Sequence, residues 1–594
     1  MINHTAVRLR ALRLLRARHR WPWPRGRCVQ GAVLVWWAVG AWTLWWSPTS
    51  LMAADIIVIR PARWSQSLEQ WRRYRQDQGW TVAEIDVAAT AESTRQRVMD
   101  YCQLHGSPRF VVLIGDARPL PEHPDDYVPT FYRRSTALVQ FGGDDMLATD
   151  LPYGDFDGDE TPDAAVGRIP ADSSEQVARF LQRVIAYEQS HDYAPWRRNV
   201  HVVAGVGGFG ALTDALIEGT TRQFLAQRIP AWSRLTLTHA SPGSVFCPSP
   251  DRFPQCCVDR FNDGGSFWVY IGHGQVKSLD WIHAANQWWP ILTEKHLPQL
   301  SAPHPPVAVF LACYTGAFDA AEDSLAESIV LHPGGAIAAI AASRVSGPYG
   351  LAMLSHGLLE AVYQRHLATL GEAMLHAKRS MLHLDGNTRG KETIGADTAS
   401  TQDAGSTAPS EATTDSLQPQ LQLIQGIAAA LTPEGYDLHQ ELQEHAWQMH
   451  LIGDPCMALA YPQEVALKAP RVAAPGSTAS LSAQLPPGRI LVELAYRRRD
   501  ARTDLSADSL DYSVPQDWSQ FQNRYEQANL PHIVAVDQAW SGGRWEHALI
   551  VPDDLPRGKY DIRLFVQCDE KFCVGHAELT IRPLAQLNTS SAAP

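Results

Sequence analysis

The 594-residue sequence lacks basic stripes. Lysine and arginine total 51 against 63 aspartates and glutamates, the formal net charge is −12, and positive charge is concentrated only in the first thirty residues. Proteins that bind nucleic acid need such stripes, because lysine and arginine release the counterions condensed on the phosphates. The charge balance therefore excludes a nucleic-acid partner. Hydrophobic residues make up 45% of the chain, which is enough for several cores.

The N-terminal segment lacks an apolar run of clear membrane-spanning length. The run GAVLVWWAVGAWTLWW (31–46) follows an arginine-rich stretch and precedes the small residues Ala53 and Ala54. These are the parts of a secretory signal. We therefore expect residues 1–54 to form a signal peptide and the protein to be exported, whether secreted, periplasmic or on the cell surface. Because Leu51 and Met52 could extend the run toward the ~17–25 residues of a membrane span, a signal anchor is the alternative. Membrane contact is expected only through this segment.

Cysteine is also scarce, with 9 residues in the chain. An exported chain meets an oxidising compartment, so cysteine pairs are interpreted first as disulfides. Cys568 and Cys573 flank a short turn, and Cys247 could pair with a cysteine at 256–257. An odd total leaves at least one thiol unpaired within the chain. Cys313 has no cysteine near it in sequence and is therefore the candidate for chemistry.

The region from 55 to 462 alternates strand and helix patterns. DIIVIRP and RFVVLIGD are near-continuous apolar strands, of the kind that parallel sheets bury on both faces. The alternation predicts an α/β fold. It occurs twice, so we expect two side-by-side subdomains, at 55–195 and 196–462, that together form a parallel-sheet unit.

The remaining segments differ in composition. Residues 385–420 consist mainly of Thr, Ser, Ala, Gly and acids, which cannot bury enough apolar surface to become ordered, and we predict a disordered insert. Residues 463–585 show short strands of period two separated by turn residues, which predicts a β-sandwich of immunoglobulin-like size. Residues 586–594 form a tail.

Two of the predicted parallel strands end in residues that can perform chemistry. SFWVYIGHG ends in His273 between two glycines, and VAVFLAC ends in Cys313. In open α/β sheets, catalytic groups collect beyond the carboxyl ends of the strands. If the two strands are neighbours, the imidazole can take the thiol proton and the thiolate can attack a carbonyl. The backbone N–H groups of Gly274 and Cys313 are the candidate oxyanion donors.

Each residue also has a structural interpretation, since buried histidines and cysteines are common at strand ends. Their shared position favours catalysis over that interpretation. No metal or organic cofactor is required for this chemistry, and the substrate would be a protein or peptide. No oligomeric state follows from the sequence.

The motifs resemble those of the gingipain-type cysteine peptidases, which share a caspase-like fold. The likeness includes GHG and AC at successive strand ends, FVVLIGDA, TDLPYGDFDGDETPDAAVGRIP, GGAIAAIAAS and the closing LIGDP, over residues 55–462. The immunoglobulin-like region resembles the domain that follows the gingipain catalytic region. The resemblance implies an exported cysteine endopeptidase in which Cys313 and His273 form the catalytic dyad. The competing hypothesis is a non-catalytic cell-surface binding or adhesion protein on a peptidase-like scaffold.

The sequence departs from the family at the acid that orients the histidine. In gingipains this acid lies in the loop after GG, and here Leu212 occupies that neighbourhood. Asp214 and Glu218 are the candidate substitutes. Asp214 is preferred because it lies nearer the glycine turn; the other interpretation is that it only stabilises a helix N-terminus.

Two further motifs are weaker. GVGGFG (205–210) has the form of a dinucleotide-binding loop but lacks the acid expected about twenty residues later, so a tight turn beside the cleft is favoured. The loop DFDGDETPD spaces four carboxylates as candidate calcium ligands, although it lacks the glycine and glutamate positions of an EF-hand, and a solvated acidic turn is equally consistent with it. The four residues are Asp155, Asp157, Asp159 and Asp163.

Overall fold

The computed structural model describes residues 53–118, 125–207, 228–383, 425–430, 432–497, 505 and 510–583. The predicted insert at 385–420, the tail at 586–594 and nearly all of the predicted signal segment lie outside the described residues. None of the helices in the described ranges combines the length and apolarity that a membrane crossing requires.

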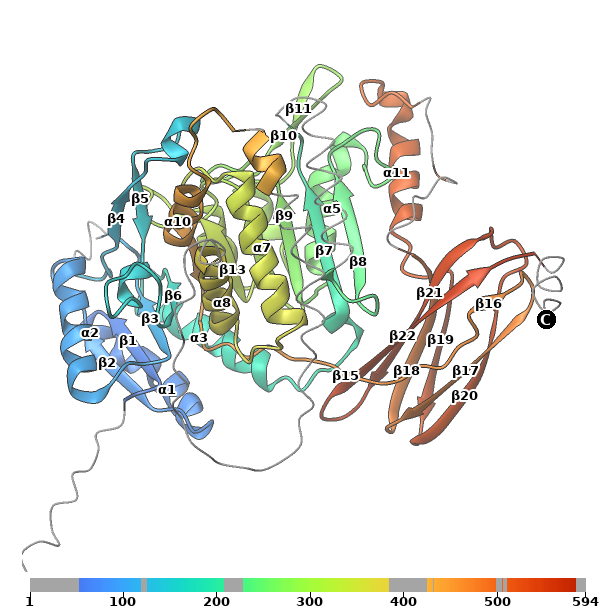
Figure 1. Cartoon of the computed structure of the whole chain (residues 1–594), viewed down its shortest axis with the longest axis horizontal. Helices are drawn as coiled ribbons and strands as arrows, with labels where there is room; N and C mark the ends of the chain where they lie inside the picture. Colours follow the sequence, from blue (N-terminus) through green and yellow to red (C-terminus); the bar gives the residue numbers. More distant parts are fainter. Residues whose placement is uncertain are drawn as a thin grey trace, which may run out of the picture. The chain divides into compact units, whose positions relative to one another are not determined.

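A ten-stranded sheet forms the core of the α/β region (Figure 1). Its strand order is β2-β1-β3-β6-β14-β13-β12-β9-β7-β8, and all neighbours are parallel except β13 and β14. The first four strands come from the predicted subdomain at 55–195, and the β6–β14 pair joins them to the second half. The predicted α/β class with two side-by-side halves is confirmed. The strands are β1 (Ile56–Arg60), β2 (Val82–Asp86), β3 (Phe110–Ile114), β6 (Ala165–Ile169), β7 (Asn199–Ala204), β8 (Arg234–His239), β9 (Phe267–Ile271), β12 (Val307–Leu311), β13 (Ala338–Ala342) and β14 (Met449–Ile452).

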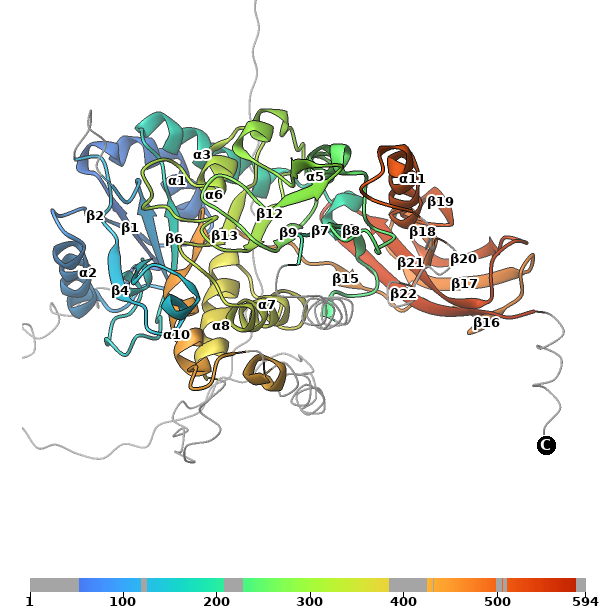
Figure 2. The same cartoon turned by 90° about the horizontal axis from the view of Figure 1, so that it is seen from above.

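Helices cover both faces of this sheet. Figure 2 shows α1, α3, α5 and α6 on one face and α7, α8 and α10 on the other. Helix α3 begins after Ser173, whose hydroxyl accepts a hydrogen bond from the backbone N–H of Gln176. The helices are α1 (Glu69–Asp77), α2 (Ala91–His105), α3 (Ser174–Gln189), α5 (Phe253–Asn262), α6 (Leu325–Leu331), α7 (Pro348–Tyr363), α8 (Leu370–His383) and α10 (Leu438–Gln448).

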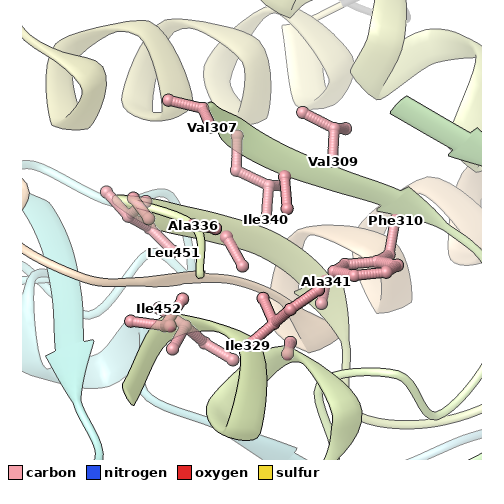
Figure 3. Close-up of a cluster of buried hydrophobic side chains, with 14 of the residues drawn as sticks. Val307, Val309, Phe310, Ile329, Ala336, Ile340, Ala341, Leu451 and Ile452 are labelled. Atoms are coloured by element: carbon pink, nitrogen blue, oxygen red, sulfur yellow. The ribbon is translucent and has the colours of Figure 1, made fainter. Parts of the chain in front are cut away.

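The central strands are buried on both faces, as their continuous apolar sequences predict. Every residue of β12 and β13 is buried. Figure 3 shows Val307, Val309 and Phe310 of β12 beside Ile340 of β13, and Ile329 of α6 near Ala341 and Ile452 in the same buried cluster. Burial of apolar surface contributes roughly 25 cal/mol per Å². This rigid centre fixes the positions at which β9 and β12 end.

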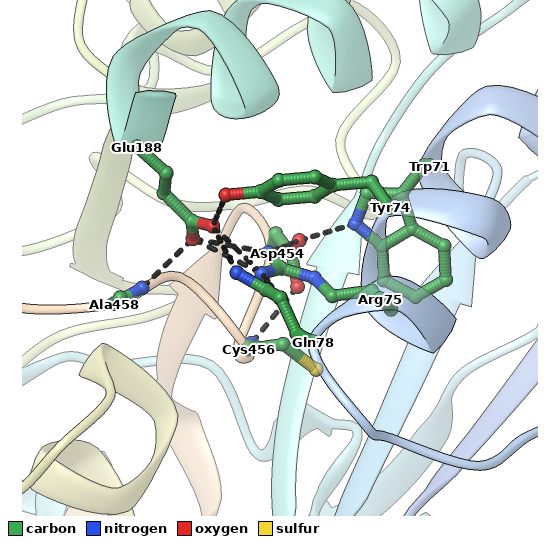
Figure 4. A network of polar contacts seen from close by, with 8 residues as sticks. All are labelled: Trp71, Tyr74, Arg75, Gln78, Glu188, Asp454, Cys456 and Ala458. Carbon is green, nitrogen blue, oxygen red and sulfur yellow. Dashed lines mark hydrogen bonds and ion pairs between the residues drawn. The ribbon is translucent and has the colours of Figure 1, made fainter. Parts of the chain in front are cut away.

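A buried ionic network ties the two halves together (Figure 4). Asp454, in the LIGDP motif after β14, accepts hydrogen bonds from Trp71 Nε1 at 2.6 Å and Arg75 Nη2 at 2.7 Å. Arg75 of α1 also donates to Glu188 of α3 at 2.8 Å. The side chains of Arg75, Glu188 and Asp454 are at most 3% exposed. The motif therefore has a structural role. Because β14 runs antiparallel to β13, Asp454 lies near the start of β13, whereas Cys313 lies near the end of the parallel strand β12.

Two short hairpins lie outside the main sheet. Strand β4 (Phe131–Arg134) pairs with β5 (Met146–Thr149), and β10 (Trp281–Ala284) pairs with β11 (Gln287–Pro290). The second hairpin follows His273 directly in the chain.

The C-terminal region contains two β-sheets that share one apolar core. Its two sheets agree with the predicted sandwich; the immunoglobulin-like topology stays a prediction. A helix in this region, α11 (Trp518–Ala528), was not predicted; its Tyr525 hydroxyl lies 2.9 Å from Thr238 Oγ1 of β8. The strands are β15 (Gln463–Glu464), β16 (Val472–Ala473), β17 (Thr478–Leu485), β18 (Gly488–Tyr496), β19 (Val534–Trp540), β20 (Gly543–Ile550), β21 (Gly558–Gln567) and β22 (Phe572–Ile581).

Candidate active site

His273 and Cys313 follow the ends of two neighbouring strands. Strands β9 and β12 are parallel, and Ile271 is the register partner of Leu311. His273 and Cys313 each lie two residues beyond this last pair, so both residues reach the same carboxyl edge of the sheet. The neighbour relation on which the sequence prediction depended is therefore present.

A close backbone contact joins the two strand ends. A β-carbon at Gly274 would lie 2.6 Å from the carbonyl oxygen of Cys313 and 2.9 Å from Cβ of Ala312. Only glycine fits against backbone at that distance. The second glycine of GHG is thus required for the histidine and cysteine loops to pack together.

The thiol of Cys313 lies in a polar turn. Cys313 is half-buried, and the backbone N–H of Ser346 donates a hydrogen bond to its Sγ at 3.3 Å. Burial raises the pKa of the thiol, whereas the Ser346 N–H and the backbone N–H of Cys313 itself lower it. Tyr314, the next residue, has φ of 57°, a left-handed conformation that costs energy for a non-glycine residue. The chain turns sharply here and keeps the sulfur at the edge of the sheet.

The Ser346 loop was missed by the sequence analysis. The loop follows β13, which is the second neighbour of β12 and runs parallel to it. The carboxyl end of β13 therefore lies at the same edge of the sheet as Cys313. Arg344 braces the loop through an ion pair with Asp319 at 2.6 Å and another with Asp144 at 3.1 Å. The apolar strand GAIAAIAAS was the sequence signal for this loop. The residues after its end could have been considered as hydrogen-bond donors to the Cys313 thiol, as the residues after the other two strands were.

The backbone of His273 is held from below by a buried tyrosine. The Tyr270 hydroxyl donates a hydrogen bond to the carbonyl oxygen of His273 at 2.8 Å, and Tyr270 is fully buried. The His273 side chain is exposed. Gly205, the first glycine of GVGGFG, is needed beside this tyrosine, because a β-carbon there would lie 2.6 Å from its hydroxyl. This contact accounts for Gly205 without a nucleotide.

The candidate oxyanion donors lie on the same edge. Within the described ranges, the backbone N–H groups of Gly274 and Cys313 take part in no backbone–backbone hydrogen bond of the loops and turns. The candidate orienting acid Asp214, together with Glu218 and Leu212, falls in 208–227, which lies outside the described residues.

The acidic loop brings three of its four carboxylates together. Ligand oxygens of Asp155, Asp157 and Asp159 lie within 4.8 Å of one another, while Asp163 is not in the group. The carboxylate of Asp163 instead accepts a hydrogen bond from the backbone N–H of Phe156 at 2.7 Å. Hard oxygen ligands in a turn fit an ion such as calcium.

The chain matches a known protein family. The family model described as Peptidase family C25 matches residues 49–460. A curated relative, Gingipain R2 of Porphyromonas gingivalis (strain ATCC BAA-308 / W83), is 22% identical over 273 residues, which are 44% of this chain and 32% of the relative. The chain thus spans about a third of that relative's length.

Two solved structures are also similar. The Arg-specific cysteine proteinase gingipain R (RGPB) aligns with 90% of this chain and 99% of its own, at 15% identity and a TM-score of 0.48. A complex of the Porphyromonas gingivalis RgpB pro- and mature domains aligns with 89% of this chain and all of its own, at 14% identity and a TM-score of 0.47.

Proposed function

The chain belongs to peptidase family C25, the gingipain family, and from this premise we propose that it is an exported cysteine endopeptidase whose catalytic dyad is Cys313 and His273. The observation that carries the proposal is the register of β9 and β12, which ends both strands at one edge. The family match supports peptidase chemistry and a protein or peptide substrate. The roles of individual residues are inferred from their positions.

The reaction begins with transfer of the thiol proton of Cys313 to the imidazole of His273. The thiolate attacks the carbonyl carbon of the scissile peptide, forming a carbon–sulfur bond while the carbonyl oxygen takes the electron pair. The backbone N–H groups of Gly274 and Cys313 stabilise this oxyanion. His273 then gives the proton to the leaving amine, the carbon–nitrogen bond breaks, and an acyl-enzyme remains. Water activated by His273 hydrolyses the thioester and restores the thiol.

The Ser346 N–H stabilises the reacting sulfur in this scheme. Burial alone disfavours the thiolate, and the hydrogen bond at 3.3 Å offsets part of that effect. A thiolate that is stabilised by one donor and by the imidazolium can form without full exposure to water.

A cysteine comparison tests the proposal. Cys313→Ala should lose at least about 10³-fold in hydrolysis of a denatured protein substrate, because no other group can form the acyl-enzyme. Cys102→Ala is the matched control, since Cys102 is also half-buried but lies on α2. Equal hydrolysis by folded Cys313→Ala and wild type would contradict the dyad, and no hydrolysis by the folded wild type would support the alternative, a non-catalytic surface protein.

The proposal includes export and a structural ion. Export is supported by the charged, apolar and small-residue order of residues 1–54.

We propose that Asp155, Asp157 and Asp159 hold a calcium ion that stabilises their loop and takes no part in peptide hydrolysis. Added Ca²⁺ should raise the melting temperature of the wild type more than that of Asp157→Asn, and equal shifts would remove the ion from the proposal.

A further inference from the structure

The loop after His273 folds straight back on itself. Gly274 and Leu279 form an antiparallel bridge, and the backbone N–H of Gln275 donates to the carbonyl oxygen of Ser278 at 2.8 Å. In an antiparallel pair, the residue before one bridge partner faces the residue after the other. His273 therefore faces Asp280, and residues opposed in this way have Cβ atoms about 4.5–5.5 Å apart on one side of the ribbon.

From this pairing we infer that Asp280 is the positioning residue of His273: its carboxylate accepts the imidazole N–H that faces away from Cys313. The inference rests on the proposed function of the dyad. It gives the carboxylate role to a residue downstream of the histidine on the same hairpin, in place of Asp214.

One buried phenol fixes the backbones of both residues. The Tyr270 hydroxyl donates to the carbonyl oxygen of His273 at 2.8 Å and accepts from the backbone N–H of Asp280 at 3.4 Å. Tyr270 itself is fully buried in β9. A single rigid side chain thus sets the separation of His273 and Asp280.

The carboxylate of Asp280 has one oxygen available for this role. Its Oδ1 accepts a hydrogen bond from the backbone N–H of Trp281 at 2.8 Å. Its Oδ2 is buried and forms no hydrogen bond of normal geometry among the described residues, and the backbone N–H of Val206 lies near the carboxylate. A buried, unpartnered carboxylate oxygen is costly, and an imidazole N–H would remove that cost.

The electrostatic surroundings agree with this geometry. Burial raises the pKa of Asp280, and the Trp281 N–H, the nearby His273 and the backbone N–H of Val206 lower it. The Coulombic interaction with His273 favours the charged carboxylate of Asp280, which is the form that can accept a hydrogen bond from an imidazole N–H.

The hairpin that carries Asp280 is anchored on its other side. The backbone N–H of Ile291, just after β11, donates to the carbonyl oxygen of Asp280 at 2.8 Å, and Leu279 N–H donates to Leu292 at 2.8 Å. Leu279 and Ile291 are fully buried. Asp280 therefore lies at the fixed base of β10 and β11, where a positioning group must be rigid to be effective.

Neighbouring acids on this side of the site already have a cationic partner. Lys277 Nζ lies 3.2 Å from Glu294 Oε2 and also pairs with Glu322. Glu294 is exposed, and its carboxylate pairs with Lys277. It supplies a matched control, a nearby acid of the same loop system that is not assigned to His273.

The test measures the reactivity of Cys313 itself, so that it does not depend on peptide hydrolysis. Full-length wild type, Asp280→Asn, Glu294→Gln and His273→Ala are alkylated with iodoacetamide across pH 4–10, and the Cys313 peptide is quantified by mass spectrometry. Asp280→Asn should move the onset of Cys313 alkylation about one pH unit higher, in the same direction as His273→Ala. Glu294→Gln should follow the wild type.

Steady-state hydrolysis on the same variants completes the test. Asp280→Asn should lower kcat about 10²-fold with little change in KM, and Asp280→Glu should recover part of the loss. An alkylation profile of folded Asp280→Asn that coincides with the wild type overturns the inference, even if the enzyme is a peptidase. A shifted profile in a protein that hydrolyses no peptide would uphold the positioning role and contradict the proposed function.

Discussion

The two halves of the ten-stranded sheet end differently at their carboxyl edge. In the half built from β1, β2, β3 and β6, Arg168 is buried and its guanidinium is saturated: it forms two contacts of 2.7 Å with Asp150 and donates to the carbonyl oxygens of Gly115 and Val128. In the other half, the strand ends carry an exposed His273 and a half-buried Cys313.

The difference separates structure from chemistry within one architecture. In the first half the named charges are Arg168, inside β6, and Asp150, and the two are paired and buried. In the second half the reactive groups keep accessible faces, and backbone donors surround them. The same sheet architecture therefore supports both a structural and a reactive edge, and the side chains near the strand ends determine which of the two is formed.

The largest expected effect falls on the open half. His273→Ala should reduce hydrolysis by at least about 10³-fold because the thiol loses its base and the leaving amine its acid. Circular dichroism and the melting temperature should remain near those of the wild type, since the His273 side chain is exposed. Full activity in a folded His273→Ala variant would erase the contrast between the two edges.

A large stability effect falls on the closed half. Arg168→Met should lower the free energy of unfolding by about 3–5 kcal/mol, because it leaves the buried carboxylate of Asp150 without its partner. Adding Asp150→Asn should recover part of this loss by removing the unpaired charge. Denaturant titration measures both, and kcat per folded molecule should stay unchanged. A loss of kcat without a loss of stability would show that the closed edge also takes part in catalysis.

A pH effect sharpens the comparison at the boundary between the halves. Burial raises the pKa of Glu327 in α6 to about 8, and the nearby Asp116 and Asp323 add to the shift. The folded state therefore holds this proton where the unfolded state has released it, so stability should fall as pH rises from about 4.5 to about 8, by roughly 1.4 kcal/mol for each pH unit.

Glu327→Gln should flatten this part of the stability–pH curve and be relatively more stable at pH 8. Thermal melts between pH 4.5 and 8 measure the difference. Parallel curves for the variant and the wild type would mean that Glu327 is ionised in the folded protein.

The smallest expected effect lies outside both halves. Cys568 and Cys573 lie near each other at the β21–β22 turn, close enough for one thiol to donate to the other. If they oxidise to a disulfide, a reductant should lower the melting temperature of the wild type by a few degrees and leave Cys568→Ser unaffected, because a short loop loses little entropy. Identical melts of the two proteins with and without reductant would assign no bond to this turn.

Most of the sheet could be predicted because its strands are continuous apolar runs. His273 and Cys313 were found because each directly ends such a run. Ser346 could have been found in the same way, after β13. Asp280 could not, because its position opposite His273 depends on the bridge between Gly274 and Leu279, which no apolar pattern marks.

Helix α11 was missed for a related reason. It lies within a region of period-two strands, and only a few of its residues are buried, among them Phe521 and Tyr525. Their partners include Thr238 in β8, nearly 290 residues earlier in the chain. Local sequence cannot reveal a face that packs against so distant a segment. The parallel sheet expected from the sequence contains one antiparallel pair, between β13 and β14.

The most direct test of the central claim is covalent labelling of the open edge. The full-length protein is incubated with a panel of peptidyl acyloxymethyl ketones that differ in the residue before the reactive ketone, and the adducts are located by mass spectrometry. The account predicts one thioether adduct, on Cys313, formed far more slowly in His273→Ala and absent from Cys102. A folded protein that gives no adduct on Cys313, or the same labelling rate without His273, would contradict it.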